Sequence, residues 1–135
     1  MAKVKKETKQ EMALPLNKEL VDLDTSFMNE HLGWEQPEYI TQNMVHEFRG
    51  YQEEALRYFH YSQVSEVFKF RNINHVLFNM ATGSGKTDLM AGLILYLYHE
   101  HEYQNFLFFV NTSSVLNKTI DNLTNKKSEK YLYSS

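Results

Sequence analysis

The sequence predicts an α/β fold in which parallel strands are flanked by helices. Two apolar runs, residues 76–78 and 106–110, have the bulk and brevity of buried strands. Helical spacing of apolar residues follows each run, over residues 89–98 and from near Val115. A glycine-rich turn joins the first run to its helix. Strands and helices in alternation build a parallel sheet with helices on its faces.

The chain before this alternation divides into two parts. Residues 1–41 include both prolines and are interpreted as a partly flexible lead-in region with a short helix near residues 16–23. Residues 42–67 have the spacing of a long amphipathic helix, in which Gly50 marks either a break or the helix start. We therefore predict a lead-in region over residues 1–41, one domain over residues 42–125 and a polar tail over residues 126–135.

The glycine-rich turn has the composition of a phosphate-binding loop. Backbone N–H groups between Gly83 and Lys86 would surround a polyphosphate, and the following helix would direct its positive end at the same place. Lys86 would reach the β and γ phosphates, and the Thr87 hydroxyl would hold Mg²⁺. Met80 stands where the usual G-x-x-x-x-G-K-[ST] pattern begins with glycine. The turn still predicts binding of a nucleoside triphosphate.

The run from Ala81 to Thr87 resembles motif I of superfamily 2 helicases and translocases. With Asn79 and Met80 before it, the run is most similar to the motor of type III, or the related type I, restriction endonucleases. The resemblance implies part of a RecA-like P-loop NTPase lobe, with ATP and Mg²⁺ as cofactors. It implies DNA as a partner of the full-length enzyme and admits a modification methyltransferase subunit as another. The implied loop residues are Thr82, Gly83, Ser84, Gly85, Lys86 and Thr87.

A second element lies upstream of the loop. The run from Phe48 to Leu56 is similar to the L-R-x-Y-Q-x-x-A element that precedes motif I in the same family. This resemblance implies that Gln52 reads adenine, because a carboxamide offers a donor and an acceptor that suit the N6/N7 edge. Tyr51 or Phe48 would pack near the base. The alternative is an ordinary amphipathic helix that contributes Phe48 and Leu56 to the core.

A third element follows the second apolar run. Thr112 and Ser113 belong to a polar turn that resembles motif Ia, which implies contact with the nucleic-acid backbone. Helix capping by the same hydroxyl side chains is the alternative interpretation.

Several parts of such a motor are missing from the sequence. No apolar strand ending in Asp-Glu follows Val110, and no arginine finger, second motor lobe or nuclease domain is found. The resemblance covers about residues 48–123, the first part of a first motor lobe. Phosphoryl transfer depends on such charged groups, so we assign no catalytic residue and expect little or no ATP hydrolysis by this chain alone.

Composition limits the remaining functions. The formal net charge of −3 gives no global electrostatic case for nucleic-acid binding. The absence of cysteine excludes disulfides and thiolate metal sites, and no segment predicts a signal peptide or a membrane span, so we expect a cytoplasmic protein. Two alternatives stay open: another superfamily 2 DNA or RNA helicase, and a truncated, non-catalytic nucleotide-binding or interaction module. A small-molecule kinase fits less well because it leaves the Gln52 element without a role.

Overall fold

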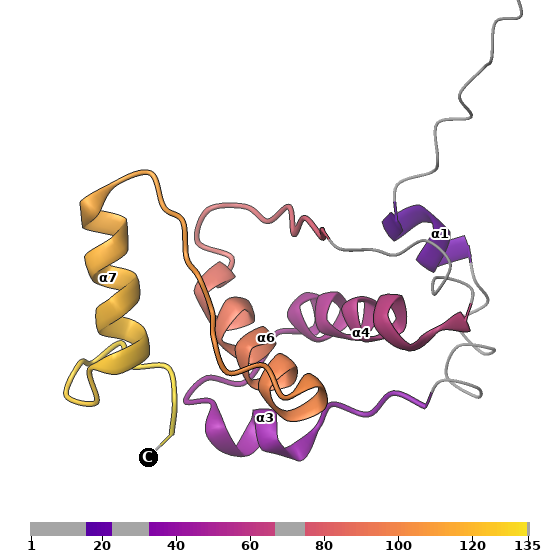
Figure 1. Ribbon diagram of the computed structural model, residues 1–135, viewed down its shortest axis with the longest axis horizontal. Helices are drawn as coiled ribbons and strands as arrows, with labels where there is room; N and C mark the ends of the chain where they lie inside the picture. The colour runs from indigo at the N-terminus through magenta and orange to yellow at the C-terminus, as the bar shows by residue number, and fades with distance from the viewer. Residues whose placement is uncertain (1–15, 23–32, 67–74, 135) are drawn as a thin grey trace, which may run out of the picture. The chain divides into compact units, whose positions relative to one another are not determined.

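The computed structural model describes residues 16–22, 33–66 and 75–134 (Figure 1). Contacts divide the chain into two units, Met1–Gly33 and Trp34–Ser135. The first unit contains α1 (Leu16–Asp22), which confirms the short helix predicted in this region. The flexible part predicted at the start of the lead-in region, about residues 1–11, lies outside the described residues.

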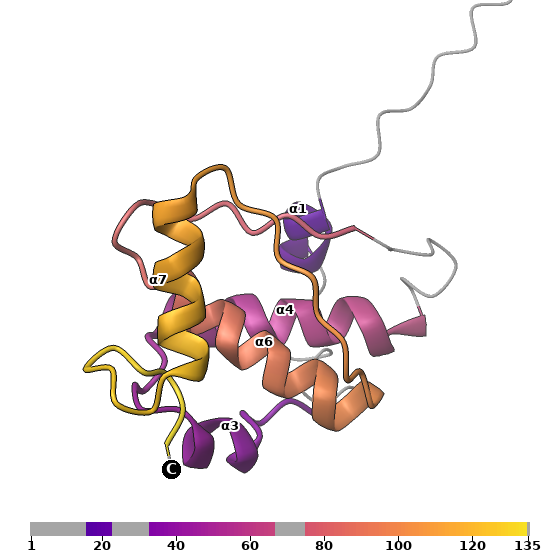
Figure 2. The same cartoon turned by 60° about the vertical axis from the view of Figure 1, so that its left-hand side comes forward.

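The described part of the second unit contains four helices. They are α3 (Glu38–Asn43), α4 (Gly50–Val64), α6 (Lys86–His101) and α7 (Ser113–Thr124). Helices α3 and α4 both pack against α6 (Figure 2). Of the two roles predicted for Gly50, the helix start is confirmed: α4 begins there, and residues 44–49, which the prediction over residues 42–67 included, are not helical. The Gln52 side chain sets this start, since its Oε1 accepts the backbone N–H of Arg49 at 2.8 Å.

The core lies where α3, α4 and α6 meet. Phe48, in the segment before α4, points its ring at the backbone of Gly92 in the middle of α6. A Cβ atom at position 92 would collide with the ring tip, which explains why a glycine interrupts this apolar helix. The buried core residues are Ile40, Met44, Phe48, Leu56, Leu89, Ala91, Tyr96 and Leu132.

Aromatic contacts hold the carboxyl-terminal half of α6. Tyr39 of α3 donates its hydroxyl to Glu100 at 2.8 Å and stacks on His99 with ring centroids 4.2 Å apart. The Tyr96 hydroxyl lies 2.8 Å from His60 Nδ1 of α4, and burial raises the pKa of Tyr96 to about 12. These contacts link α3 and α4 to the half of α6 farthest from the glycine-rich turn.

The last described residues belong to the core. Leu132 is buried, and its carbonyl accepts the Val45 N–H at 2.9 Å, beside an antiparallel bridge between Met44 and Tyr133. The segment predicted as a polar tail therefore places two apolar side chains against the residues that lead into α4. Because the first half of this segment is rich in lysine, the sequence does not indicate that its second half packs in the core.

The predicted parallel sheet is not confirmed, since no strand forms in residues 33–66 or 75–134. Phe78 in the first apolar run packs on the core, but its neighbour Leu77 is 89% exposed. In the second run, Leu107 is 85% and Phe109 is 91% exposed. Two parallel strands alone cannot cover both of their faces, so these runs stay unpaired when no further strand lies beside them.

Gly92→Ala is expected to lower the free energy of unfolding by about 1–3 kcal/mol, although alanine is the better helix former. The new methyl group must displace the buried Phe48 ring. Gly50→Ala in the first turn of α4 is the matched control, because a Cβ atom there meets nothing within 4 Å. Urea denaturation of both variants measures the difference. A stabilising Gly92→Ala would show that Phe48 does not occupy this position.

Leu107→Ala is expected to change the free energy of unfolding by less than about 0.5 kcal/mol, because the side chain is exposed. Leu56→Ala, which empties a fully buried position, is expected to cost about 2–5 kcal/mol. The same denaturation experiment compares them. A cost at Leu107 that approaches the cost at Leu56 would mean that the second apolar run is buried in solution.

Candidate phosphate-binding site

The glycine-rich turn leads directly into the amino terminus of α6. Gly83 and Gly85 have φ angles of +80° and +77°, a left-handed conformation that glycine adopts without steric cost. Gly85 is the N-cap residue and Lys86 is the first residue of the helix. The first N–H groups of a helix have no partner within it and add to the positive end of its dipole. The turn therefore presents the donors that an anion requires.

Inside the turn, the Lys86 side chain folds back over the residues before it. Its Nζ donates to the carbonyl groups of Met80 at 2.8 Å and Ala81 at 2.7 Å. Ser84 Oγ donates to the same Ala81 carbonyl at 2.7 Å. Lys86 is exposed, so an arriving anion can replace these neutral acceptors with stronger, charge-assisted hydrogen bonds.

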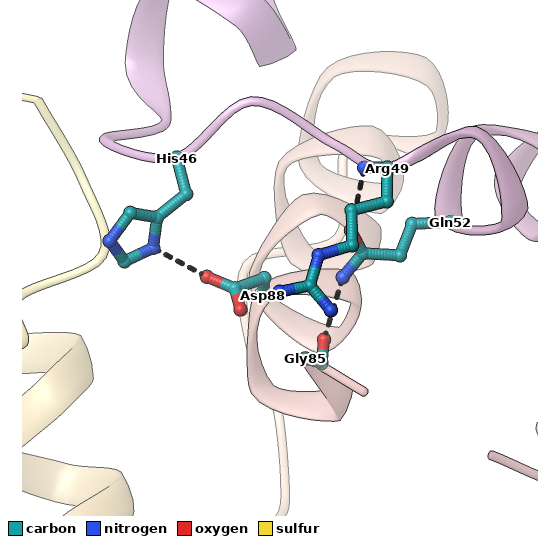
Figure 3. A network of polar contacts seen from close by, with 5 residues as sticks. All are labelled: His46, Arg49, Gln52, Gly85 and Asp88. Carbon is teal, nitrogen blue, oxygen red and sulfur yellow. Dashed lines mark hydrogen bonds and ion pairs between the residues drawn. The ribbon is translucent and has the colours of Figure 1, made fainter. Parts of the chain in front are cut away.

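Helix α4 holds the turn through Gln52. The Gln52 Nε2 donates to the Gly85 carbonyl at 2.9 Å, while its Oε1 accepts the Arg49 N–H (Figure 3). The carboxamide is buried, and a Cβ atom at Gly85 would lie 2.5 Å from Nε2. The carboxamide nitrogen can donate two hydrogen bonds and the oxygen can accept two, so each atom can still form one more. The residue predicted to read adenine thus also fixes the turn.

Tyr51 makes a second contact between α4 and the turn. Its hydroxyl donates to the Ser84 carbonyl at 2.7 Å and accepts from Arg49 Nη1 at 3.0 Å. From the sequence, Tyr51 is expected only as a packing partner of the base, and this contact was not predicted. Phe48, the other residue considered for that role, is buried against Gly92, and it is therefore a core residue.

A third contact joins the segment before α4 to the first turn of α6. His46 Nδ1 lies 2.8 Å from Asp88 Oδ1 (Figure 3). The Asp88 carboxylate lies at the positive end of the helix, where a negative charge is stabilised. This pair was not predicted, because two residues so distant in the sequence carry no local signal of their contact.

Thr112 and Ser113, predicted to touch nucleic acid, lie at the start of α7. Thr112 is the N-cap residue, and its Oγ1 accepts the Val115 N–H at 3.3 Å. The helix begins at Ser113, two residues earlier than expected. Among the described residues, no hydrogen bond or ion pair joins Thr112 or Ser113 to the glycine-rich turn. Their contact with nucleic acid stays a prediction.

A glycine-rich turn at a helix amino terminus is the geometry typical of proteins with a phosphate-binding loop. Comparison with known families is more specific: residues 45–134 match the family described as "Type III restriction enzyme, res subunit". The chain belongs to this family, which confirms the resemblance noted in the sequence and implies the RecA-like P-loop fold.

A relative supports the same assignment. The chain is 42% identical over 102 residues to the "Probable type III restriction-modification enzyme HindVIP Res subunit" of Haemophilus influenzae. The match takes in 72% of this chain and 20% of the relative, so the chain spans about a fifth of the relative's length. No solved structure matches the chain. None of the helices in the described ranges is long and apolar enough to cross a membrane.

Gly85→Ala is expected to destabilise the chain more than Gly83→Ala. Both variants place alanine in a left-handed conformation, at a cost of about 1–2 kcal/mol. Only position 85 also displaces the Gln52 side chain, which adds about 1 kcal/mol for the lost hydrogen bond. Denaturation of both variants, of Gln52→Ala and of Gln52→Ala/Gly85→Ala gives the coupling energy between positions 52 and 85. Equal losses at positions 83 and 85 would contradict the contact with Gln52.

Proposed function

We propose that residues 82–87 bind the phosphates of ATP with Mg²⁺, and that the chain is the ATP-binding amino-terminal part of a DNA translocase of the type III restriction kind. The hydrogen bond from Gln52 to Gly85, 33 residues apart, carries this proposal. A turn that only connected two elements would need no buried amide from another helix. A nucleotide site needs its base-reading and phosphate-binding elements side by side.

Each residue of the turn has a role in this proposal. Backbone N–H groups from Gly83 to Thr87 bind the phosphate oxygens at the positive end of α6. Lys86 leaves the carbonyl groups of Met80 and Ala81 for the β and γ phosphates. Thr87 holds Mg²⁺ through its hydroxyl. Gln52 keeps one donor and one acceptor, the pair that the N6/N7 edge of adenine requires.

The activity of a whole enzyme is a further step of the proposal. The relative is named as part of a restriction-modification enzyme, which supports DNA and a methyltransferase subunit as partners. A cytoplasmic location is part of the same proposal. Thr112 and Ser113 would contact the DNA backbone. The runs at residues 76–78 and 106–110 would become sheet strands once neighbouring strands cover exposed side chains such as Leu107.

The isolated chain is expected to bind ATP without turning it over. The sequence has no Asp-Glu motif after Val110 to activate water. This point favours a non-catalytic nucleotide-binding module as the second candidate for the chain as it stands. Vigorous DNA-stimulated hydrolysis by the purified chain would exclude that candidate.

Calorimetric titration with Mg·ATP tests the proposal. Lys86→Ala is expected to weaken binding by about 10- to 100-fold, because it removes a charge-assisted hydrogen bond. Lys118→Ala, which removes an exposed lysine of α7, is the matched control and should bind as the unchanged chain does. Failure of the folded chain to bind Mg·ATP would overturn the proposal. Unchanged binding by Lys86→Ala would place the nucleotide elsewhere.

A further inference from the structure

The hydroxyl of Tyr51 meets the phosphate loop at a specific peptide group. It lies 2.7 Å from the carbonyl oxygen of Ser84, while the neighbouring Gln52 binds the carbonyl of Gly85. Two consecutive side chains at the start of α4 thus hold two consecutive carbonyl groups of the loop. We infer that Tyr51 is a positioning residue that orients the Gly85 N–H for a phosphate group. This inference rests on the proposed function and deepens it.

The geometry of the peptide bond connects the hydroxyl to the phosphate donor. In a planar trans peptide, the C=O group and the following N–H group point in opposite directions. A donor that draws the Ser84 carbonyl toward α4 therefore turns the Gly85 N–H away from α4. The Gly85 carbonyl accepts both Gln52 Nε2 and the Leu89 N–H of α6 at 3.1 Å, so Gln52 and the helix together set the direction of the Lys86 N–H. Neither of these N–H groups has a hydrogen-bond partner among the described residues, so both are available to an anion.

The loop needs such an external support because glycine leaves the orientation of this peptide group open. Gly85 can adopt either sign of φ, so the plane between Ser84 and Gly85 can rotate at little steric cost. A hydrogen bond to the carbonyl favours one orientation before the ligand arrives. A site that is ordered in advance binds more tightly, because the ligand does not have to order it.

Arg49 determines the direction of the phenolic proton. Its Nη1 donates to the Tyr51 oxygen at 3.0 Å, which leaves the hydroxyl proton for the Ser84 carbonyl. The positive guanidinium group also polarises the phenol and makes it a stronger donor. The contact of Tyr51 with the loop is thus a directed hydrogen bond, whereas a role in base packing would require only the ring.

Tyr51→Phe separates these two roles because it keeps the ring and removes the hydroxyl. Tyr58→Phe is the matched control: Tyr58 lies on the same helix and donates to Glu54 at 3.2 Å. The probes are Mg·ATP, Mg·ADP and adenosine, with adenosine measured by competition. We expect Tyr51→Phe to weaken both phosphate-bearing ligands by about 5- to 10-fold and to leave adenosine unchanged. Tyr58→Phe should bind all three as the unchanged chain does.

Nitrogen-15 amide spectra of the nucleotide-free chain give a second readout. The Gly85 signal should move in Tyr51→Phe and stay in place in Tyr58→Phe. Equal weakening of adenosine would assign Tyr51 to the base and overturn the inference, as would full binding of Mg·ATP by Tyr51→Phe. If the unchanged chain fails to bind Mg·ATP, the proposed function fails and the inference fails with it. Binding by the unchanged chain with no loss in Tyr51→Phe defeats the inference alone.

Discussion

The buried carboxamide of Gln52 is the interaction on which the site depends. With its oxygen it closes the first turn of α4, and with its nitrogen it holds Gly85, the N-cap residue of α6. One side chain therefore fixes the start of two helices that are distant in the sequence. A buried polar group that is hydrogen-bonded adds rigidity, whereas the same group left unpaired would destabilise the fold. This arrangement requires glycine at position 85, because any larger residue would displace the Gln52 amide.

Close packing of Phe48 on Gly92 sets the distance between the segment before α4 and helix α6, which these polar contacts connect. The aromatic ring reaches the backbone of α6, so the segment before α4 lies directly against the helix that follows the loop. The same segment includes His46, which contacts Asp88 in the first turn of α6. Apolar packing thus brings the two elements together, and the hydrogen bonds then select their orientation. Neither contribution alone would place Tyr51 and Gln52 at the loop.

The parts of this fold that depend on local signals could be predicted from the sequence. The loop at Gly83–Gly85 and the helix after it follow from glycine content and apolar spacing, and the importance of Gln52 follows from its resemblance to a known element. The sheet could not be judged in this way, because strand pairing depends on neighbours outside the local sequence. Contacts such as that of Tyr51 with Ser84 depend on tertiary geometry. The burial of Leu132 was not predicted, because the lysines before it are typical of an exposed tail.

Main-chain hydrogen bonds connect α7 to the entrance of α4. The Leu132 N–H donates to the Asn122 carbonyl of α7 at 3.0 Å, and the Leu132 carbonyl accepts from Val45 at 2.9 Å. Bonds of this kind do not depend on which side chains the residues carry, so the connection tolerates sequence drift in related chains. Proline is the exception, because it has no N–H to donate. Positions 45 and 132 should therefore both exclude proline, and position 132 also needs an apolar side chain, because Leu132 is buried in the core.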